Sequence, residues 1–268
     1  MKTVGLIGFG AIGRYIVKHW ASAASDYRLT HVLGRTAQLD DMRKACGAGT
    51  MVTDRPDEFL DDLPDIVIEA AGHTAVKMHG PAILAAGREL YLLSIGVTAD
   101  QECIDLLKRA CQDGGGRISM PAGALAGFDG LLALHASGLR RVCYTSRKPA
   151  FAWKGTPGAA LYDLGTIETA MTIFEGSARD AAKLYPKNAN LAAAVAMAGL
   201  GLDDTNIVLI ADPDIQENIG EIEAEGDLGR LFVRVSGEAD PHNPKTSVVV
   251  GASVLSALAN QSSIFRYI

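Results

Sequence analysis

The chain has 268 residues, of which 48% are hydrophobic and 21% charged, so it can bury a core and form one large domain or two of ordinary size. Its formal net charge of −6 argues against nucleic acid as the main partner, because binding to a phosphate backbone needs a basic face. No uncharged apolar stretch reaches the ~18 residues of a membrane-spanning helix, so we expect no membrane partner, and no signal peptide because a glycine motif begins at once.

The glycine motif follows the first apolar segment and reads Gly8-x-Gly10-x-x-Gly13. Helix-compatible residues follow from Ala11 and Ile12 onward, and the order of strand, glycine turn and helix is the context that gives this motif its meaning. Gly8 permits the tight turn, Gly10 lets the backbone approach a pyrophosphate, and Gly13 lets helix and strand pack closely. The free amides at the helix start attract phosphate. The sequence therefore predicts a nicotinamide dinucleotide, NAD or NADP; the alternative is an ordinary glycine turn.

The first 120 residues alternate strand-like and helix-like segments. Predicted strands are Thr3–Ile7, Tyr27–Leu33, Met51–Val52, Asp65–Glu69, Glu89–Ser94 and Arg117–Met120. Predicted helices are Ile12–Ala21, Leu39–Cys46, Ala75–Ala86 and Gln101–Cys111. This alternation with short connections indicates a parallel sheet covered on both faces, and hence an α/β fold with a Rossmann dinucleotide-binding domain at residues 1–120.

From about residue 121 the pattern changes to strands separated by turns. Predicted strands are Arg141–Arg147, Thr205–Ala211, Ile219–Ala224 and Leu231–Val235, and predicted helices are Leu161–Leu164, Ala178–Tyr185 and Ala189–Ala198. A second α+β domain with a mostly antiparallel sheet is expected at 121–245. The closing apolar segment, Thr246–Ala259, is expected to be helical, with residues 246–268 returning to the first domain.

The end of the second predicted strand bears on the choice of cofactor. NAD-binding domains of this type place an Asp or Glu about 20 residues beyond the glycines, where it binds the ribose 2′-hydroxyl. Here the strand ends in Leu33-Gly34-Arg35-Thr36, without an acid. Arg35 and Thr36 could accept a 2′-phosphate, which favours NADP or use of both nucleotides. The alternative is that Arg35 stacks on adenine or points into solvent.

Several polar blocks punctuate the chain. They are Glu69–Ala75, which includes Ala71 and Gly72, then Ser94–Val97, Arg147–Pro149, Phe174–Arg179, Tyr185–Asn190 and Asn243–Ser247, which opens the last predicted helix. Each block alone could be turn or capping chemistry. Together, and in this order, they resemble the L-aspartate dehydrogenase family over essentially the whole length of the chain.

The resemblance implies NAD(P)-dependent oxidative deamination of L-aspartate to iminoaspartate, which hydrolyses to oxaloacetate and ammonia, or the reverse reductive amination. It implies a homodimer and a possible role in NAD biosynthesis. On the family pattern Ala124 and Asn190 contact the cofactor, and Ala71 and Gly72 are expected to line the same site.

A dicarboxylic amino acid needs cations for its carboxylates and donors to orient it. The residues nominated for substrate binding are Arg147, Lys148, Ser177, Lys187, Lys245 and Thr246, and Lys245 is also nominated for catalysis. The alternative for each cation is a solvated surface side chain.

At one position the chain departs from the family pattern. The resemblance places a catalytic histidine after an Ala-Asp-Pro turn, but this chain has Gly220 there, within Asn-Ile-Gly-Glu-Ile. Glycine cannot transfer a proton. Either His242 or Glu221 substitutes, or water fills the space and the enzyme is slow or prefers another dicarboxylic amino acid, or this sequence carries a substitution. A dehydrogenase or imine reductase for a related substrate, and a catalytically impaired dinucleotide-binding homologue, therefore stay open as alternatives.

The remaining histidines and the four cysteines are scattered. They show no disulfide framework and no metal-ligand spacing, so we expect no metal and a reducing, cytoplasmic location. His73 follows a predicted strand end on the cofactor side, where it could touch the ligand.

Overall fold

The computed structural model describes residues 1–186, 188–240, 243–247 and 249–267, with only the backbone of 239–240 and 243–247. The chain divides into two compact units. Unit 1 comprises Met1–Gly123 and Val250–Ile268, and unit 2 comprises Ala124–Val249.

Unit 1 contains a six-stranded parallel sheet in the order β3-β2-β1-β4-β5-β6. The strands are β1 (Lys2–Ile7), β2 (Tyr27–Leu33), β3 (Met51–Thr53), β4 (Ile66–Glu69), β5 (Glu89–Leu92) and β6 (Arg117–Ser119). The chain runs outward from β1 to β3, returns to β4 beside β1, and runs outward again to β6. The strand order therefore reverses between β1 and β4, and in open α/β sheets ligands bind at the carboxyl ends of the strands at such a point. The predicted Rossmann arrangement is confirmed.

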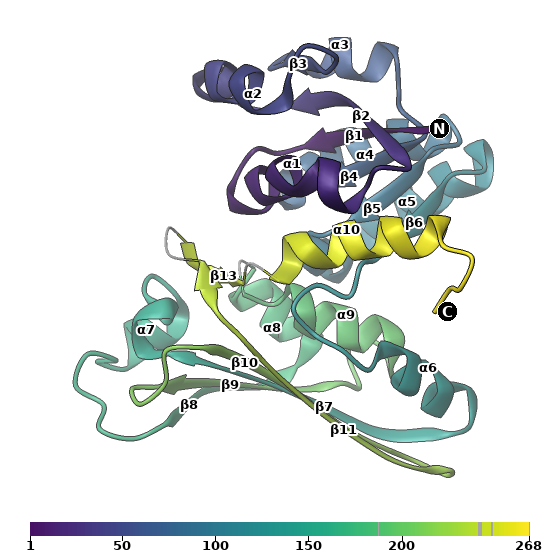
Figure 1. Cartoon of the computed structure of the whole chain (residues 1–268). Helices are drawn as coiled ribbons and strands as arrows, with labels where there is room; N and C mark the ends of the chain where they lie inside the picture. The colour runs from purple at the N-terminus through teal and green to yellow at the C-terminus, as the bar shows by residue number, and fades with distance from the viewer. Residues whose placement is uncertain (187, 241–242, 248, 268) are drawn as a thin grey trace. The chain divides into compact units, whose positions relative to one another are not determined.

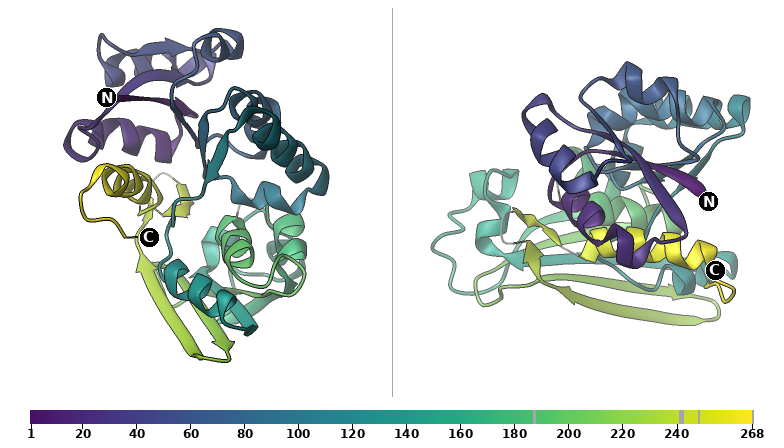
Figure 2. Two further views of the ribbon diagram at one scale, coloured as in Figure 1. Left: turned by 90° about the vertical axis from the view of Figure 1, so that its right-hand side faces the viewer. Right: turned by 45° about the horizontal axis from the view of Figure 1, so that its top comes forward.

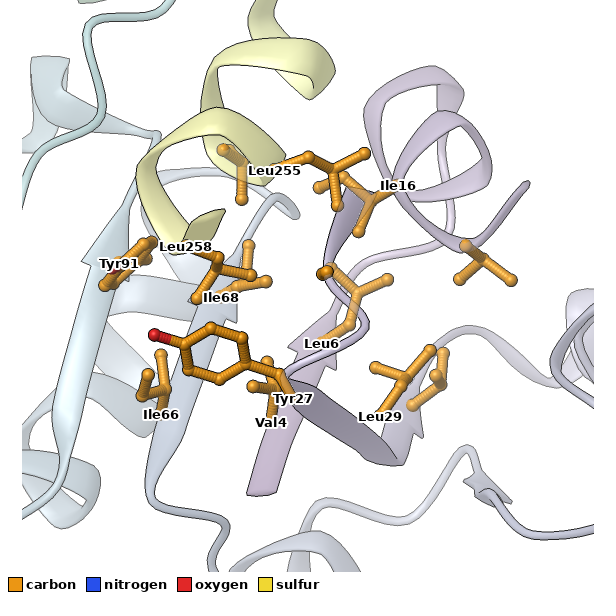
Figure 3. Close-up of a cluster of buried hydrophobic side chains, with 14 of the residues drawn as sticks. Val4, Leu6, Ile16, Tyr27, Leu29, Ile66, Ile68, Tyr91, Leu255 and Leu258 are labelled. Atoms are coloured by element: carbon orange, nitrogen blue, oxygen red, sulfur yellow. The ribbon is translucent and has the colours of Figure 1, made fainter. Parts of the chain in front are cut away.

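Helices pack on this sheet from several parts of the chain. They are α1 (Ala11–Ala23), α2 (Leu39–Cys46), α3 (Pro56–Asp61), α4 (His73–Ala85), α5 (Gln101–Gly114) and α10 (Val249–Ser262), with the 3₁₀ segments η1 (Thr36–Gln38) and η2 (Ile95–Ala99). Both views of Figure 2 show α10, in yellow, beside the purple α1. Leu255 and Leu258 of α10 lie in one buried cluster with Leu6, Ile16 and Ile68 (Figure 3). The last helix of the chain thus completes the core of unit 1.

Unit 2 contains a five-stranded sheet in the order β11-β10-β7-β9-β8. Only the pair β7 and β9 is parallel, so the predicted mostly antiparallel sheet is confirmed. The strands are β7 (Leu139–Pro149), β8 (Met171–Ser177), β9 (Asn206–Asp212), β10 (Asn218–Gly226) and β11 (Gly229–Gly237), with a separate ribbon of β12 (Ala239–Asp240) and β13 (Asn243–Ser247).

One face of this sheet carries the helices of unit 2. The helical segments are α6 (Phe128–Ala136), η3 (Ala150–Trp153), α7 (Pro157–Leu161), α8 (Ala178–Leu184) and α9 (Asn190–Ala198). Helices α6, α8 and α9 lie along the same side of the strands (Figure 1). Among the described residues of the whole chain, no helix is both long and apolar enough to cross a lipid bilayer.

Two predicted elements are wrong, and strand β8 is absent from the prediction. The helix expected at Leu161–Leu164 lies earlier in the chain, because Pro157 occupies the first turn of α7, where its fixed φ suits the helix start. Strand β8 escapes prediction because a register shift between Thr172 and Phe174 breaks the alternation of its side chains. The residues Asn243–Ser247 form β13 rather than opening the last helix, since a proline favours extended backbone before it, and α10 begins only at Val249.

Candidate functional site

The turn between β1 and α1 has the geometry that its three glycines predict. Gly8 has φ +105°, and a Cβ there would lie 2.6 Å from the carbonyl oxygen of Ala70. A Cβ at Gly13 would lie 2.1 Å from the carbonyl oxygen of Gly8, so only glycine lets α1 approach β1 this closely. A Cβ at Gly10 would have no atom within 4 Å in unit 1. The backbone at Gly10 therefore borders open space, as the approach of a pyrophosphate to the main chain requires.

Helix α1 begins directly after this turn. Gly10 is its N-cap, no side-chain hydrogen bond caps it, and its first turn contains no acidic residue. The N–H groups of the first turn, including those of Ala11 and Ile12, have no partner within the helix. Together with the positive end of the helix dipole they form an environment that suits a phosphate group.

The end of β2 carries the residues nominated for the adenosine ribose. Arg35 and Thr36 are both exposed. The side-chain oxygen of Gln38 accepts hydrogen bonds from the backbone N and the Nε of Arg35, at 3.2 and 3.4 Å, and its Nε2 donates to the carbonyl oxygen of Phe9 at 2.9 Å. Gln38, which sequence analysis does not single out, thus tethers Arg35 to the glycine turn.

The end of β4 supplies a second turn. Ala71 and Gly72 connect β4 to α4, and Gly72 has φ +116° and ψ 172°, a combination that is essentially restricted to glycine. A Cβ at Gly72 would have no atom within 4 Å. The N–H groups of both residues donate to the buried carboxylate of Glu69, at 2.7 Å each. The carboxyl ends of β1 and β4 therefore both carry glycines that face open space in unit 1.

In unit 2, alternate residues of β7 face the covering helices. Tyr144, Ser146 and Lys148 are all buried on this face. Gly220 of β10 pairs directly with Ser146 and so lies on the same face. The Nζ of Lys148 lies 5.5 Å from the centroid of the Trp153 ring, within the range of a cation–π contact. One face of the sheet thus holds both a cation and Gly220, where the sequence resemblance leads us to expect a histidine.

The space beside Gly220 is narrow. A Cβ at this position would lie 3.1 Å from Leu125 Cδ1 and 3.3 Å from the hydroxyl oxygen of Tyr144. Burial raises the pKa of Tyr144, although a hydrogen bond with Ser146 opposes this shift. A neutral phenol and a leucine therefore line Gly220, the position at which the sequence resemblance leads us to expect an imidazole.

Arg147 lies on the opposite face of the sheet. Neighbouring residues of a strand point to opposite faces, so Arg147 and Lys148 are separated by the sheet. The Arg147 Nη1 donates to Asp212 Oδ2 at 2.8 Å, and Asp212 Oδ1 accepts from the backbone N–H of Asp214 at 2.9 Å. Arg147 therefore forms an ion pair with the end of β9, and we do not retain it among the substrate ligands.

The Asp212–Arg147 pair predicts a defined acid sensitivity. The hydrogen bond from Arg147 lowers the pKa of Asp212. The pair therefore stabilises the folded state above the ordinary Asp pKa of about 4, and this contribution disappears as the pH falls through the lowered pKa. We expect Arg147→Met to lower the Tm at neutral pH and to differ less from the wild type at about pH 2. Thermal denaturation at both pH values measures the difference, and an equal deficit at both would contradict this assignment.

Other nominated residues occupy helix starts. The Ser177 hydroxyl accepts from the backbone N–H of Asp180 at 3.1 Å and donates to its carboxylate at 2.8 Å, so Ser177 caps α8. Asn190 is the first residue of α9, and Ala124 lies in the turn before α6. Asn188, which sequence analysis misses, is buried, and its Nδ2 has no hydrogen-bond partner among the described residues. Because an unsatisfied buried amide is unfavourable, this Nδ2 is a candidate ligand donor.

The side chains of four nominated residues lie outside the described part of the chain. Lys187 and His242 lie outside the described residues. Lys245 and Thr246 belong to β13, but their side chains also lie outside the described part of the chain.

Comparisons with known proteins cover both units. The family described as "Aspartate dehydrogenase, C-terminal" matches residues 129–261, and "Homoserine dehydrogenase, NAD binding domain" matches residues 8–121. The L-aspartate dehydrogenase of Cupriavidus taiwanensis is 39% identical over 262 residues, which cover 98% of each chain. That of Pseudomonas aeruginosa is 44% identical over 213 residues, 78% of this chain and 80% of the relative. The solved aspartate dehydrogenase of Thermotoga maritima shares the fold, with a TM-score of 0.76, 21% identity and full coverage of both chains. The chain therefore belongs to the L-aspartate dehydrogenase family.

Proposed function

We propose that this protein is an NAD(P)-dependent L-aspartate dehydrogenase. It oxidises L-aspartate to iminoaspartate, which hydrolyses to oxaloacetate and ammonia, or it runs the reverse reductive amination. The observation that carries the proposal is the match to L-aspartate dehydrogenases over nearly the whole chain. The two glycine turns of unit 1, which leave room over the backbone of Gly10 and Gly72, support the binding of a pyridine nucleotide.

The chemistry divides between bound cofactor and protein. When bound, the nicotinamide accepts the hydride from the α-carbon of the substrate. The protein holds the dinucleotide on the amides that follow β1, with Ala124 and Asn190 as further contacts on the family pattern. Lys148 attracts a substrate carboxylate, as does Lys245, and Thr246 donates a hydrogen bond.

Two further groups in unit 2 bear on substrate binding. The Ser177 hydroxyl donates to Asp180 in the free protein, so it would have to exchange this partner to reach a substrate. The Nδ2 of Asn188 needs no such exchange among the described residues. We therefore place Asn188 ahead of Ser177 as a hydrogen-bond donor to substrate or cofactor.

The glycine at position 220 favours a second candidate function. Without an imidazole, proton transfer worth about 10²–10⁴-fold in rate is lost at that position. A slow enzyme, a dehydrogenase or imine reductase for a bulkier dicarboxylic amino acid, or a dinucleotide-binding homologue without turnover would each be consistent with Gly220. His242, three residues before Lys245, is the residue that we propose for a substitute role. Glu221 does not fit this role, because it lies on the opposite face of the sheet in an ion pair with Arg234.

Steady-state assays separate these functions. The purified chain should be tested with L-aspartate, 3-substituted aspartates and L-glutamate, and in reverse with oxaloacetate and ammonia, each with both nucleotides. Highest kcat/KM with aspartate supports the first proposal, and a preference for a 3-substituted analogue supports the second enzyme. Nucleotide binding without turnover of any of these compounds would overturn both enzymatic proposals.

The arginine after β2 sets the expected nucleotide preference. We propose that Arg35 and Thr36 bind the 2′-phosphate of NADP, because the position carries a tethered cation where NAD-binding domains have an acid. Arg35→Asp should then raise the Kd for NADPH by about 10-fold or more, while that for NADH changes far less. Fluorescence titration of the two nucleotides measures this, and equal losses for both would remove Arg35 from nucleotide selection.

The second face of the unit 2 sheet fits the homodimer that the family pattern implies. Among the described residues, no helix of unit 2 packs on the face opposite α6, α8 and α9 (Figure 1). Phe232 is 63% exposed there, and Glu221 and Arg234 form an ion pair of 2.9 Å on the same face. Light scattering should give twice the chain mass of 28.2 kDa, and Phe232→Asp should lower it.

We further infer a cytoplasmic location and a supply of iminoaspartate to NAD biosynthesis. All four cysteines are free, and burial raises the pKa of each thiol, in Cys46 to about 11. Such thiols are unreactive and suit a reducing compartment.

A further inference from the structure

A buried carboxylate connects two strand ends in unit 1. Glu69, the last residue of β4, is fully buried. Its Oε1 accepts hydrogen bonds from the N–H groups of Ala71 and Gly72, both at 2.7 Å, and from the Ser94 hydroxyl at 3.0 Å. Its Oε2 accepts from the backbone N–H of Ser94 at 3.0 Å. One side chain thus holds the turn after β4 and the turn after β5.

Such a carboxylate is expensive to keep inside a protein. Burial raises the pKa of Glu69, and the hydrogen bonds from Gly72, Ala71 and Ser94 oppose this shift. Removing a charge from water is unfavourable, so a buried carboxylate is maintained where its acceptor oxygens do something that a neutral side chain cannot. At Glu69 the acceptors satisfy backbone donors of two turns, one of them at Ser94, 25 positions along the chain from Glu69.

The place of these turns in the sheet assigns them to one part of a dinucleotide. In a sheet of this order, one mononucleotide half binds over β1 to β3 and the other over β4 to β6, with the pyrophosphate at the point of reversal. The turn at Gly8 follows β1, and the N–H of Ala70 in the β4 turn donates to the carbonyl oxygen of Ile7, the last residue of β1, at 2.8 Å. The open space above Gly72 therefore lies at the start of the second half.

We propose that Glu69 is a positioning residue for the nicotinamide half of the cofactor. It fixes the glycine-specific conformation of Gly72 and the start of η2 at Ser94, so that both turns present a preformed wall to the nicotinamide nucleotide. It does not touch the cofactor itself. This proposal rests on the nucleotide binding in the proposed function, but not on aspartate as the substrate.

The test compares a ligand that contains only the adenosine half of the cofactor with ligands that contain both the adenosine and the nicotinamide halves. Glutamine at position 69 keeps the shape of the side chain but replaces an acceptor oxygen by an NH₂ donor, so at least one backbone N–H then faces another N–H. By calorimetry, Glu69→Gln should raise the Kd of NADPH and NADH about tenfold, while the Kd of ADP, which lacks the nicotinamide half, should stay within about twofold. Ser94→Ala removes only the hydroxyl donor and should raise the dinucleotide Kd about threefold.

Asp65→Asn is the matched control, at the residue that precedes the first residue of β4. The Asp65 Oδ2 accepts from the N–H and the hydroxyl of Thr3, at 2.8 Å each, so the substitution alters a hydrogen-bonded carboxylate at the end of β4 that is opposite the turns. It should leave the affinities for ADP and for both dinucleotides within about twofold.

The outcomes separate the possible failures. Equal weakening of ADP and dinucleotide by Glu69→Gln, or no weakening of either, overturns the positioning role. If that variant does not fold, Ser94→Ala decides, and unchanged dinucleotide binding there overturns the proposal. A wild-type chain that binds neither nucleotide overturns this inference together with the cofactor assignment. One that binds nucleotide but does not turn over aspartate overturns the proposed function alone.

Discussion

Replacing Gly220 by histidine should raise kcat/KM for L-aspartate by about 10²-fold, the lower end of what a positioned acid or base contributes. The position lies on the helix-covered face of the unit 2 sheet, opposite Ser146 and on the same face as Lys148. An imidazole there would occupy the position at which the sequence resemblance leads us to expect one. The gain is expected at the lower end because the new Cβ would meet Leu125 and Tyr144 at 3.1 and 3.3 Å. Both neighbours must move by a few tenths of an ångström to admit it.

Gly220→Ala is the control for this crowding. Alanine introduces the same Cβ without a titratable group, so its effect on Tm and on kcat/KM measures the steric part alone. Histidine should exceed alanine in kcat/KM, and the gain should depend on pH near the ordinary histidine pKa of about 6.5. Parallel pH–rate profiles of the two variants measure both quantities. Equal activity of the two variants at all pH values would mean that the protein has rebuilt its proton transfer elsewhere, with His242 as the first residue to replace.

The six strands of unit 1 and most of its long helices could be predicted from sequence for a physical reason, whereas the short helix α3 (Pro56–Asp61) is missed. The strands of unit 1 are buried on both faces and so form short apolar runs between turns, as in the predicted strand Tyr27–Leu33, which the structure reproduces as β2. The elements of unit 2 are harder to predict from sequence, because some of them depart from the local patterns that are typical of strands. The register shift in β8 disrupts the alternation of side chains, and β13 contains a proline in a two-stranded ribbon. Such irregularities depend on neighbouring strands rather than on local sequence.

In the candidate site, too, a local motif predicts some features, whereas others depend on residues that are distant in sequence. The roles of Gly8 and Gly13 follow from a local motif, and the structure gives both the close contacts that the motif predicts. The hydrogen bonds of Glu69 join strand ends that are distant in sequence, so no local pattern reveals them. The cations Arg147 and Lys148 are neighbours in sequence, and only the pairing of β7 with β10 shows which of them shares a face with Gly220.

The position of Lys148 on the same face as Gly220 leads to the second prediction of a large effect on activity. Lys148→Met should lower kcat/KM for L-aspartate by about 10²-fold, because it removes a buried charge that we assign to a substrate carboxylate. Methionine keeps an unbranched apolar chain that can still pack against Trp153, so the fold should be retained. The loss should appear mainly as a higher KM if Lys148 stabilises the bound substrate and the transition state equally. Steady-state kinetics over a wide aspartate range separates the two parameters.

Arg147→Met is the matched control, since it removes the adjacent cation from the opposite face. It should lower the Tm through the loss of the Asp212 ion pair but leave kcat/KM within about threefold of the wild type. NADPH affinity should be unchanged in both variants, because the glycine turns of unit 1 do not contain these residues. If Arg147→Met lost activity as strongly as Lys148→Met while retaining its fold, the assignment of the substrate to the helix-covered face would be wrong. The second carboxylate of the substrate would then be expected on the opposite face of the unit 2 sheet, the one that carries Asp212.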